Sequence, residues 1–309
     1  MSEQTNLALI IPCLNEEVTI AKVINDFQRE FEQIKIFVID NGSTDKTSEV
    51  AQAEGATIIY EANRGKGNAL RRAFSDIDAD VYLVVDGDDT YDPCFAPRMV
   101  KMLVEDKLDM VVAVRAPSSE KAYRGGHQFG NKAFNKLFKL LFGNKFSDIF
   151  SGYRVFSKAF VKSFPALSYG FEIETEICVH ATNLRLATKE IVAPYHPRPI
   201  GSNSKLNTYK DGFKILVKLI NLLRTSRPLL FYGCFGIVFT AYSLILLAPI
   251  LLTFFETGLV PRFPTLIVTV GSLVISAIFL MIGVILQTML SFQDENRRLF
   301  YLSLSRKFK

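Results

Sequence analysis

Short apolar runs alternate with amphipathic stretches along the first two hundred residues. Brief apolar runs bounded by turn residues are typical of buried strands, whereas apolar residues spaced three and four apart indicate helices. Strands are predicted at 7–12, 34–40, 56–60, 80–86 and 110–114, and helices at 16–31, 44–54 and 64–75. This alternation predicts an α/β fold with a mostly parallel sheet flanked by helices.

The strand pattern fades beyond Arg115. Helices are predicted at 125–142 and 169–184, with one more strand at 186–192. Residues 209–225 place apolar side chains such as Phe213 on one side and lysines on the other. Such a helix either lies on anionic lipid or packs on the domain, and its nearness to the apolar C-terminal part favours lipid.

Two long uncharged runs lie near the C-terminus, at 229–255 and 264–292. Each is longer than the ~20 residues that a helix needs to cross ~30 Å of hydrocarbon. Glycine, serine and threonine within both runs suit close helix packing in lipid. We therefore predict a two-helix transmembrane anchor. The expected divisions are a large cytoplasmic domain at 1–208, an amphipathic juxtamembrane helix at 209–228, transmembrane helices within 229–292 and a basic cytoplasmic tail at 293–309.

Basic residues flank this anchor on one side only. Five lysines and arginines lie between 210 and 227 and five more between 297 and 309, whereas the connecting loop carries only Arg262. The excess of basic residues predicts that the large domain and both termini are cytoplasmic. No charged-then-apolar leader opens the chain, so no signal peptide is expected.

The formal net charge is +5. A basic excess suits nucleic acid, membrane surfaces or acidic ligands. No nucleic-acid-binding module is visible in the sequence, and the basic residues gather near the apolar runs. Lipid head groups and phosphates are therefore favoured over nucleic acid as partners.

Acidic and polar residues follow three of the predicted strands. Asn15 and Glu16 follow the first, Asp40 ends the second and Asp86 ends the fourth. In parallel sheets these carboxyl ends share one edge, where ligands bind. A single aspartate there is usually a turn or cap residue, but the coincidence of three favours a site.

The most specific local signal is Asp86-Gly87-Asp88-Asp89. In extended chain, residues two apart point the same way, so Asp86 and Asp88 are expected to address one ligand. Carboxylates suit Mg²⁺ or Mn²⁺, which bind a few of them together with substrate phosphates. Such an ion neutralises charge on a nucleotide diphosphate leaving group.

A second signal is Asn63-Arg64-Gly65-Lys66-Gly67. Its glycines are expected to let the backbone approach a ligand, with Lys66 meeting a phosphate at a helix N-terminus. The spacing fits neither a P-loop, which needs Ser or Thr after the lysine, nor a dinucleotide fingerprint, which follows the first strand.

These motifs, in this order, resemble those of family 2 glycosyltransferases with the GT-A fold. The motifs concerned are Pro12-Cys13-Leu14-Asn15-Glu16, Asp40-Asn41-Gly42-Ser43-Thr44-Asp45, Gly65-Lys66-Gly67 and Asp86-Gly87-Asp88-Asp89. The second half is similar to polyprenyl-phosphate sugar synthases. There the motifs are Asp148–Arg154, Gly170–Glu174 and Arg198 with Gly201–Leu206. The resemblance covers about residues 6–212.

The resemblance implies a role for each matching residue. The residues expected to bind the donor nucleotide are Pro12, Glu16, Asp40, Lys66 and Asp86, and those expected to bind the metal are Asp86 and Asp88. The phosphates of the acceptor and the donor are expected to be bound by Arg115, Arg124, Asn131, Arg198 and Lys205. The expected catalytic residues are Asp148 and Asp88. Leu14, Asn41 and Thr90 depart from the family pattern, and Thr90 puts the full metal ligand set in doubt.

The expected reaction is inverting transfer of a sugar from a nucleotide sugar, with UDP-sugars favoured, to polyprenyl phosphate such as undecaprenyl or dolichyl phosphate at the cytoplasmic face. A lipid monophosphate is largely dianionic at pH 7, because its second pKa is near ~6. It is therefore its own nucleophile, and arginines suit the task of offsetting repulsion between the two phosphate groups. Alternatives are another lipid acceptor such as diacylglycerol, or a non-catalytic membrane partner that binds nucleotide sugar. Assembly into a homo-oligomer is a further option that the sequence leaves open.

Overall fold

The computed structural model describes residues 5–117, 125–199 and 208–305, without the side chains of 117, 125–132, 208–212, 214, 215 and 305. The chain separates into two compact units. The first comprises residues 1–219 together with 297–309, and the second comprises 220–296.

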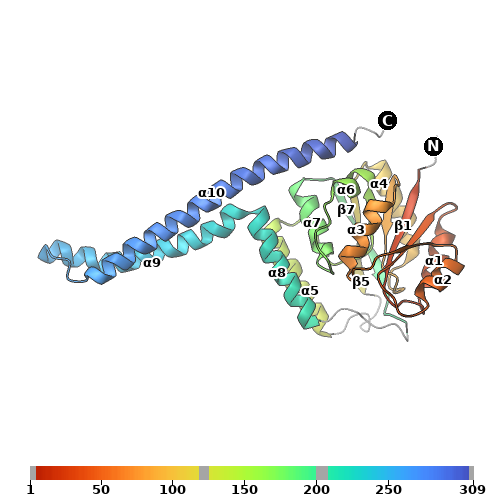
Figure 1. Ribbon diagram of the computed structural model, residues 1–309, viewed down its shortest axis with the longest axis horizontal. Helices are drawn as coiled ribbons and strands as arrows, with labels where there is room; N and C mark the ends of the chain where they lie inside the picture. Colours follow the sequence, from red (N-terminus) through yellow and green to blue (C-terminus); the bar gives the residue numbers. More distant parts are fainter. Residues whose placement is uncertain (1–4, 118–124, 200–207, 306–309) are drawn as a thin grey trace. The chain divides into compact units, whose positions relative to one another are not determined.

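A seven-stranded sheet forms the centre of the first unit (Figure 1). The strand order is β3-β2-β1-β4-β6-β5-β7, and neighbours run parallel except at β6, which is antiparallel to β4 and β5. The strands are β1 Leu7–Cys13, β2 Lys35–Asp40, β3 Thr57–Tyr60, β4 Val81–Val84, β5 Met110–Pro117, β6 Arg154–Ser157 and β7 Thr188–Tyr195. The predicted α/β fold with a mostly parallel sheet is confirmed.

Helices cover both faces of this sheet. On one face α1 packs beside α2 and α4, and on the other α3 packs beside α6. The helices of this unit are α1 Ile20–Glu30, α2 Thr47–Ala53, α3 Lys66–Asp76, α4 Ala96–Glu105, α5 Gly125–Phe142, α6 Lys158–Ser163, α7 Ile173–Asn183 and α8 Thr208–Ser226, with a short 3₁₀ helix at Pro93–Phe95. Of these, α8 runs past the end of the unit at Leu219.

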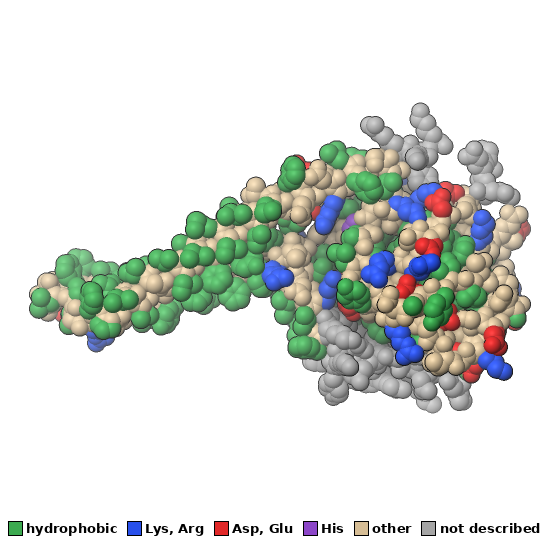
Figure 2. Space-filling model, in the orientation of Figure 1, with side chains coloured by type: hydrophobic (Ala, Val, Ile, Leu, Met, Phe, Trp, Pro, Cys, Tyr) green, Lys and Arg blue, Asp and Glu red, His purple; other side chains and the backbone are tan. Residues whose placement is uncertain are grey.

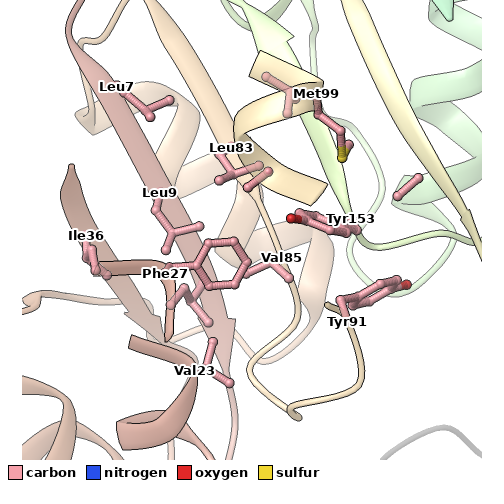
Figure 3. Close-up of a cluster of buried hydrophobic side chains, with 14 of the residues drawn as sticks. Leu7, Leu9, Val23, Phe27, Ile36, Leu83, Val85, Tyr91, Met99 and Tyr153 are labelled. Atoms are coloured by element: carbon pink, nitrogen blue, oxygen red, sulfur yellow. The ribbon is translucent and has the colours of Figure 1, made fainter. Parts of the chain in front are cut away.

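Alternate residues of each strand enter two separate cores. Leu9 and Leu83 pack with Phe27 of α1 and Met99 of α4 in one core (Figure 3). On the opposite face the rings of Tyr82 and Phe156 meet Phe74 of α3, with centroids 6.3 and 5.9 Å apart. Burial on both faces explains why β4 is apolar throughout, and it holds the strand ends rigidly at the sheet edge.

The sequence located most of these elements but missed the antiparallel part of the sheet. The expected strands at 7–12, 34–40, 56–60 and 110–114 are present, and the predicted helix at 125–142 matches α5. The expected strand at 80–86 ends earlier, at Val84. Strand β6 and helices α4 and α6 had no counterpart among the predictions. The expectation that the sheet fades beyond Arg115 was therefore wrong. The sequence pattern did not indicate β6 because this strand is only four residues long and begins with a buried arginine.

The second unit consists of the end of α8, the whole of α9, Pro228–Thr257, and most of α10, Phe263–Ser305. Both helices are long and apolar enough to cross a membrane, and hydrophobic side chains cover them in Figure 2. Polar contacts join them: Thr240 and Ser276 hydroxyls lie 2.6 Å apart, and Ser276 donates to the Gly236 carbonyl at 2.7 Å. The expected close packing through small residues is confirmed.

Helix α10 extends well beyond its apolar run, and its last residues belong to the first unit. The Tyr301 hydroxyl donates to the Asp109 carboxylate at 2.6 Å, and Arg298 donates to the Leu184 carbonyl at 3.4 Å. The expected tail at 293–309 is thus helical as far as Ser305, and its Arg298 and Tyr301 side chains form hydrogen bonds with the sheet domain.

His180 lies between the rings of Phe160 and Phe164 in the first unit. Burial, assisted by Arg297, lowers the pKa of His180 to about 4. The unfolded chain takes up this proton near pH 6.5 and the folded chain only near pH 4, so stability should fall as pH falls through this window. The slope contributed is at most about 1.4 kcal/mol per pH unit.

Thermal unfolding of the detergent-solubilised chain between pH 4 and 7 tests this contribution. The variant His180→Phe should show a shallower loss of melting temperature on acidification than the unaltered chain. Equal slopes in the two proteins would show that His180 does not resist protonation.

Candidate active site

Four carboxylates gather at the carboxyl edge of β1, β2 and β4. Their common neighbour is the Cys13 thiol at the end of β1; burial raises its pKa, and the negative charges of Glu16, Asp40, Asp86 and Asp88 raise it further. The structure therefore brings together the acidic residues that the strand ends predicted. The half-buried Pro12 lies beside them in β1.

Asp40 is fixed by the start of the next helix. Its carboxylate accepts from the Ser43 amide at 2.8 Å and from the Ser48 hydroxyl at 2.5 Å. Glu16 is likewise held in place, because its amide donates to the Thr47 hydroxyl at 2.8 Å. Both residues are buried, and these contacts fix the side chain of Asp40 and the backbone of Glu16.

Lys66 links two acidic residues that lie far apart in the sequence. Its ammonium is 2.5 Å from Asp86 and 2.5 Å from Glu174 of the Gly170–Glu174 motif. Burial alone would lower the pKa of Lys66, but the two carboxylates outweigh it and hold the pKa above its usual value. Lys66 is therefore a buried cation that fixes Asp86, and in this structure it meets carboxylates where the sequence suggested a phosphate.

The flanking glycines also contact protein. A Cβ on Gly65 or Gly67 would collide with the carbonyl oxygens of Tyr169 and Ser168, respectively. The Asn68 amide donates to the same Tyr169 carbonyl at 3.2 Å. These glycines allow the start of α3 to approach the loop at Ser168 and Tyr169.

Gly152 adjoins the same charged cluster. A Cβ there would collide with Asp86 Oδ2 and lie 2.8 Å from the Lys66 ammonium. The Gly152 amide donates to the Tyr91 hydroxyl at 2.8 Å, so its backbone is itself held. Glycine at this position leaves room for the pairing of Lys66 with Asp86.

Asp88 occupies a turn after β4 rather than extended chain. Its Oδ2 lies 2.5 Å from Arg198 and its Oδ1 accepts from the Thr90 hydroxyl at 2.6 Å. Burial and the charge of Asp86 raise the pKa of Asp88, with Arg198 opposing them. Asp86 and Asp88 therefore interact electrostatically, although each now pairs with a different cation.

Arg115 and Asp148 form a two-pronged ion pair. Arg115 Nε and Nη2 donate to the two carboxylate oxygens of Asp148 at 2.7 and 2.8 Å. Burial would raise the pKa of Asp148, but Arg115 outweighs it and the pKa lies below its usual value. The guanidinium also lies over the Tyr195 ring, 5.4 Å from its centroid. Asp148 is thus ionised and directed at Arg115.

Several expected site residues are not placed. Arg124 and Lys205 lie outside the described residues, and the side chain of Asn131 is not described. In the other direction, sequence reasoning assigned no role to Glu174, Gly152 or Thr90. Glu174 and Gly152 stood within motifs that carried the resemblance, which was the available signal.

The carboxylates of Asp86 and Asp88 fit as ligands of a divalent cation such as Mg²⁺ or Mn²⁺. Asp86 lies close enough to Asp88 to raise its pKa, and Asp88 already binds a cationic group, the Arg198 guanidinium. Within the described ranges no cluster of three or more His, Cys, Asp or Glu forms a complete metal site. Two carboxylates suit an ion that draws its remaining ligands from water and substrate phosphates.

Comparison with known proteins agrees with this geometry. The profile of the family described as glycosyl transferase family 2 matches residues 8–164. Glycosyltransferase AglJ of Haloferax volcanii is 34% identical over 243 residues, covering 77% of this chain and 78% of AglJ. Dolichyl-phosphate hexose transferase of the same organism is 26% identical over 229 residues, covering 74% and 99%.

A solved structure shows a similar fold. Glucosyl-3-phosphoglycerate synthase from Mycobacterium tuberculosis, in complex with Mn²⁺, uridine diphosphate and phosphoglyceric acid, superposes with a TM-score of 0.58 at 22% identity. The match covers 71% of this chain and 78% of that one. At this identity the likeness concerns the fold alone.

Proposed function

The chain belongs to glycosyltransferase family 2, and from this premise we propose that it transfers a sugar from a nucleotide sugar to a polyprenyl phosphate. The donor we favour is a UDP-sugar, and the face we favour is the cytoplasmic one. The observation that carries the proposal is the presence of two guanidinium groups, Arg115 and Arg198, near the acidic rim, by which we mean the carboxylates of Glu16, Asp40, Asp86 and Asp88. Arg115 lies over the Tyr195 ring, and Arg198 pairs with Asp88, whose charge adds to burial in raising the pKa of Tyr195.

The acidic rim suits the donor. Asp40 and Glu16 offer carboxylates at the ends of β1 and β2, where the base and ribose of a nucleotide bind in such sheets. Asp86 and Asp88 would hold Mg²⁺ or Mn²⁺, which when bound offsets the charge that develops on the departing diphosphate. The Lys66 ammonium pairs with Asp86 at 2.5 Å and holds that carboxylate in place.

The arginines suit a phosphate acceptor. An oxygen of the lipid phosphate attacks the anomeric carbon, the bond from that carbon to the diphosphate oxygen breaks, and the nucleoside diphosphate leaves with the electron pair. No proton has to be removed from the dianionic phosphate, and attack opposite the leaving group inverts the configuration. The chain's task is to hold two anionic groups near each other, which guanidinium forks do well.

Asp148 acts through Arg115 in this proposal. Both of its oxygens are bonded to the guanidinium, so it orients Arg115 and is not placed to take a proton from substrate. It is a positioning residue, whereas the sequence suggested a catalytic one.

A lipid acceptor is supported by the anchor and by a relative. Two helices are long and apolar enough to span a membrane, and α8 exposes Phe213, Leu216 and Val217. The name of dolichyl-phosphate hexose transferase describes transfer to a lipid phosphate by a relative that aligns over nearly its whole length. The excess of basic residues flanking the apolar runs favours the cytoplasmic side.

Transfer of radiolabelled sugar into an organic-extractable lipid tests the proposal. Purified chain is given undecaprenyl or dolichyl phosphate, Mn²⁺ or Mg²⁺, and a panel of UDP- and GDP-sugars. We expect label in the lipid with one donor, and a loss of more than about a hundredfold in Asp88→Asn. The control Asp106→Asn, which changes an exposed aspartate paired with Lys189, should keep full activity.

The contrary outcomes identify the alternatives. Label that enters diacylglycerol but not polyprenyl phosphate would replace the acceptor. Nucleotide-sugar binding without transfer to any lipid would indicate a non-catalytic role.

A further inference from the structure

Asp88 is already neutralised by a side chain of the protein itself. Arg198 Nη2 is 2.5 Å from Oδ2, and the Thr90 hydroxyl engages Oδ1. The Asp88 side chain is only 4% exposed, whereas that of Arg198 is 30% exposed. The carboxylate that the proposed function gives to a divalent cation is therefore buried and already paired with this guanidinium.

The contact is built into the backbone. Tyr195, the last residue of β7, forms an antiparallel bridge with Tyr91, and their rings lie 5.2 Å apart. The next residue, His196, donates its amide to the Thr90 carbonyl at 2.8 Å. The segment that leads to Arg198 is thus fastened to the segment that follows Asp88, and this register delivers the guanidinium to the carboxylate.

We propose that Arg198 is an internal counter-ion that competes with the divalent cation for Asp88 and passes to the donor diphosphate when cation and nucleotide arrive together. The proposal rests on the proposed function and adds to it a coupling between the binding of the cation and that of the nucleotide. A guanidinium and a divalent cation repel each other on one buried carboxylate. The diphosphate resolves this conflict, because it offers the displaced guanidinium a bidentate anionic partner.

Two consequences follow for the free and the nucleotide-bound chain. Without nucleotide, the cation has to break the ion pair of Arg198 with Asp88 and no new pair replaces it at the diphosphate, so binding is weak. With nucleotide, the same displacement forms a new ion pair. The cation therefore binds more tightly to the nucleotide-bound chain than to the free chain, and the nucleotide binds more tightly to the cation-bound chain. A purely structural ion pair would instead stay on Asp88 in both states.

Mn²⁺ binding by the purified full-length chain, followed by electron paramagnetic resonance with and without UDP, separates these cases. In Arg198→Gln, Mn²⁺ alone should bind about tenfold more tightly, and UDP in the presence of Mn²⁺ about tenfold more weakly, a size typical of coupling between ligands. The opposite signs are the signature, because general loosening of the site would weaken both. The matched control Arg72→Gln removes an Arg–Asp pair at the surface and should change neither affinity.

Each remaining outcome also decides. Arg198→Lys keeps the positive charge, and it should retain the weak binding of Mn²⁺ alone if competition is the cause. Weaker or unchanged Mn²⁺ affinity in Arg198→Gln, with circular dichroism matching the unaltered chain, would overturn the exchange while leaving the transferase proposal intact. Failure of the unaltered chain to bind Mn²⁺ even with UDP would overturn both the exchange and the cation role of Asp88.

Discussion

Replacing Lys66 with methionine is expected to lower the free energy of unfolding by about 3–5 kcal/mol and to abolish sugar transfer. The ammonium lies between Asp86 and Glu174, and both its own side chain and that of Glu174 are only 8% exposed. Without it, two carboxylates that shared one cation face each other in a poorly solvated place. One of them must take up a proton or move, and Asp86 then no longer holds the position that the donor site needs.

Lys22 provides a matched control for this prediction. It also bridges two carboxylates, Asp26 at 2.8 Å and Asp89 at 2.7 Å, but its side chain is 61% exposed. Lys22→Met should therefore cost less than about 1 kcal/mol, as exposed pairs usually do. Denaturant unfolding of both variants in detergent measures the difference.

A second variant separates stability from activity. Adding Glu174→Gln to Lys66→Met removes one buried charge, so part of the lost stability should return while transfer stays low. Equal stability of Lys66→Met and Lys22→Met would show that the ion pairs around Lys66 contribute no more than surface pairs.

The acidic rim was predictable because it depends on short-range pattern. Buried parallel strands such as β1 are read from apolar runs, and their carboxyl ends necessarily share an edge. Asp40 and Asp86 were therefore placed together correctly from the sequence alone. The parallel register, with Asp40 opposite Cys13 and Val84 opposite Ile10, confirms that these strand ends share one edge.

The partners of these residues were not predictable in the same way. Lys66 meets Glu174 across 108 positions of sequence, and no periodicity indicates such a pairing. Strand β6 was missed because Arg154 at its start is fully buried and donates to the Ser151 and Ile149 carbonyls. A charged residue in a central strand contradicts the pattern by which strands are found, and only the tertiary structure satisfies its donors.

Gly152→Ala should reduce the catalytic efficiency of transfer by about a hundredfold, since a misplacement of about 1 Å in a catalytic group can cost that much. The added methyl group would overlap Asp86 Oδ2, and the backbone has little freedom to retreat. The Tyr91 hydroxyl holds the Gly152 amide, and the neighbouring Ser151 hydroxyl donates to the Ala113 carbonyl at 2.5 Å. Asp86 must therefore move, and overpacking of this kind costs about 1–3 kcal/mol of stability.

Kinetics measured well below the melting temperature distinguish displacement of Asp86 from unfolding. Displacement should weaken Mn²⁺-dependent binding of UDP in a chain that is still folded, because the change falls on a residue of the donor site. Gly271→Ala is the matched control: apart from the adjacent backbone of its own helix, nothing lies within 4 Å of the added methyl group, so binding and transfer should be unchanged. Unaltered donor binding in Gly152→Ala would mean that Asp86 tolerates displacement, and the pairing of Lys66 with Asp86 would then serve stability rather than the donor site.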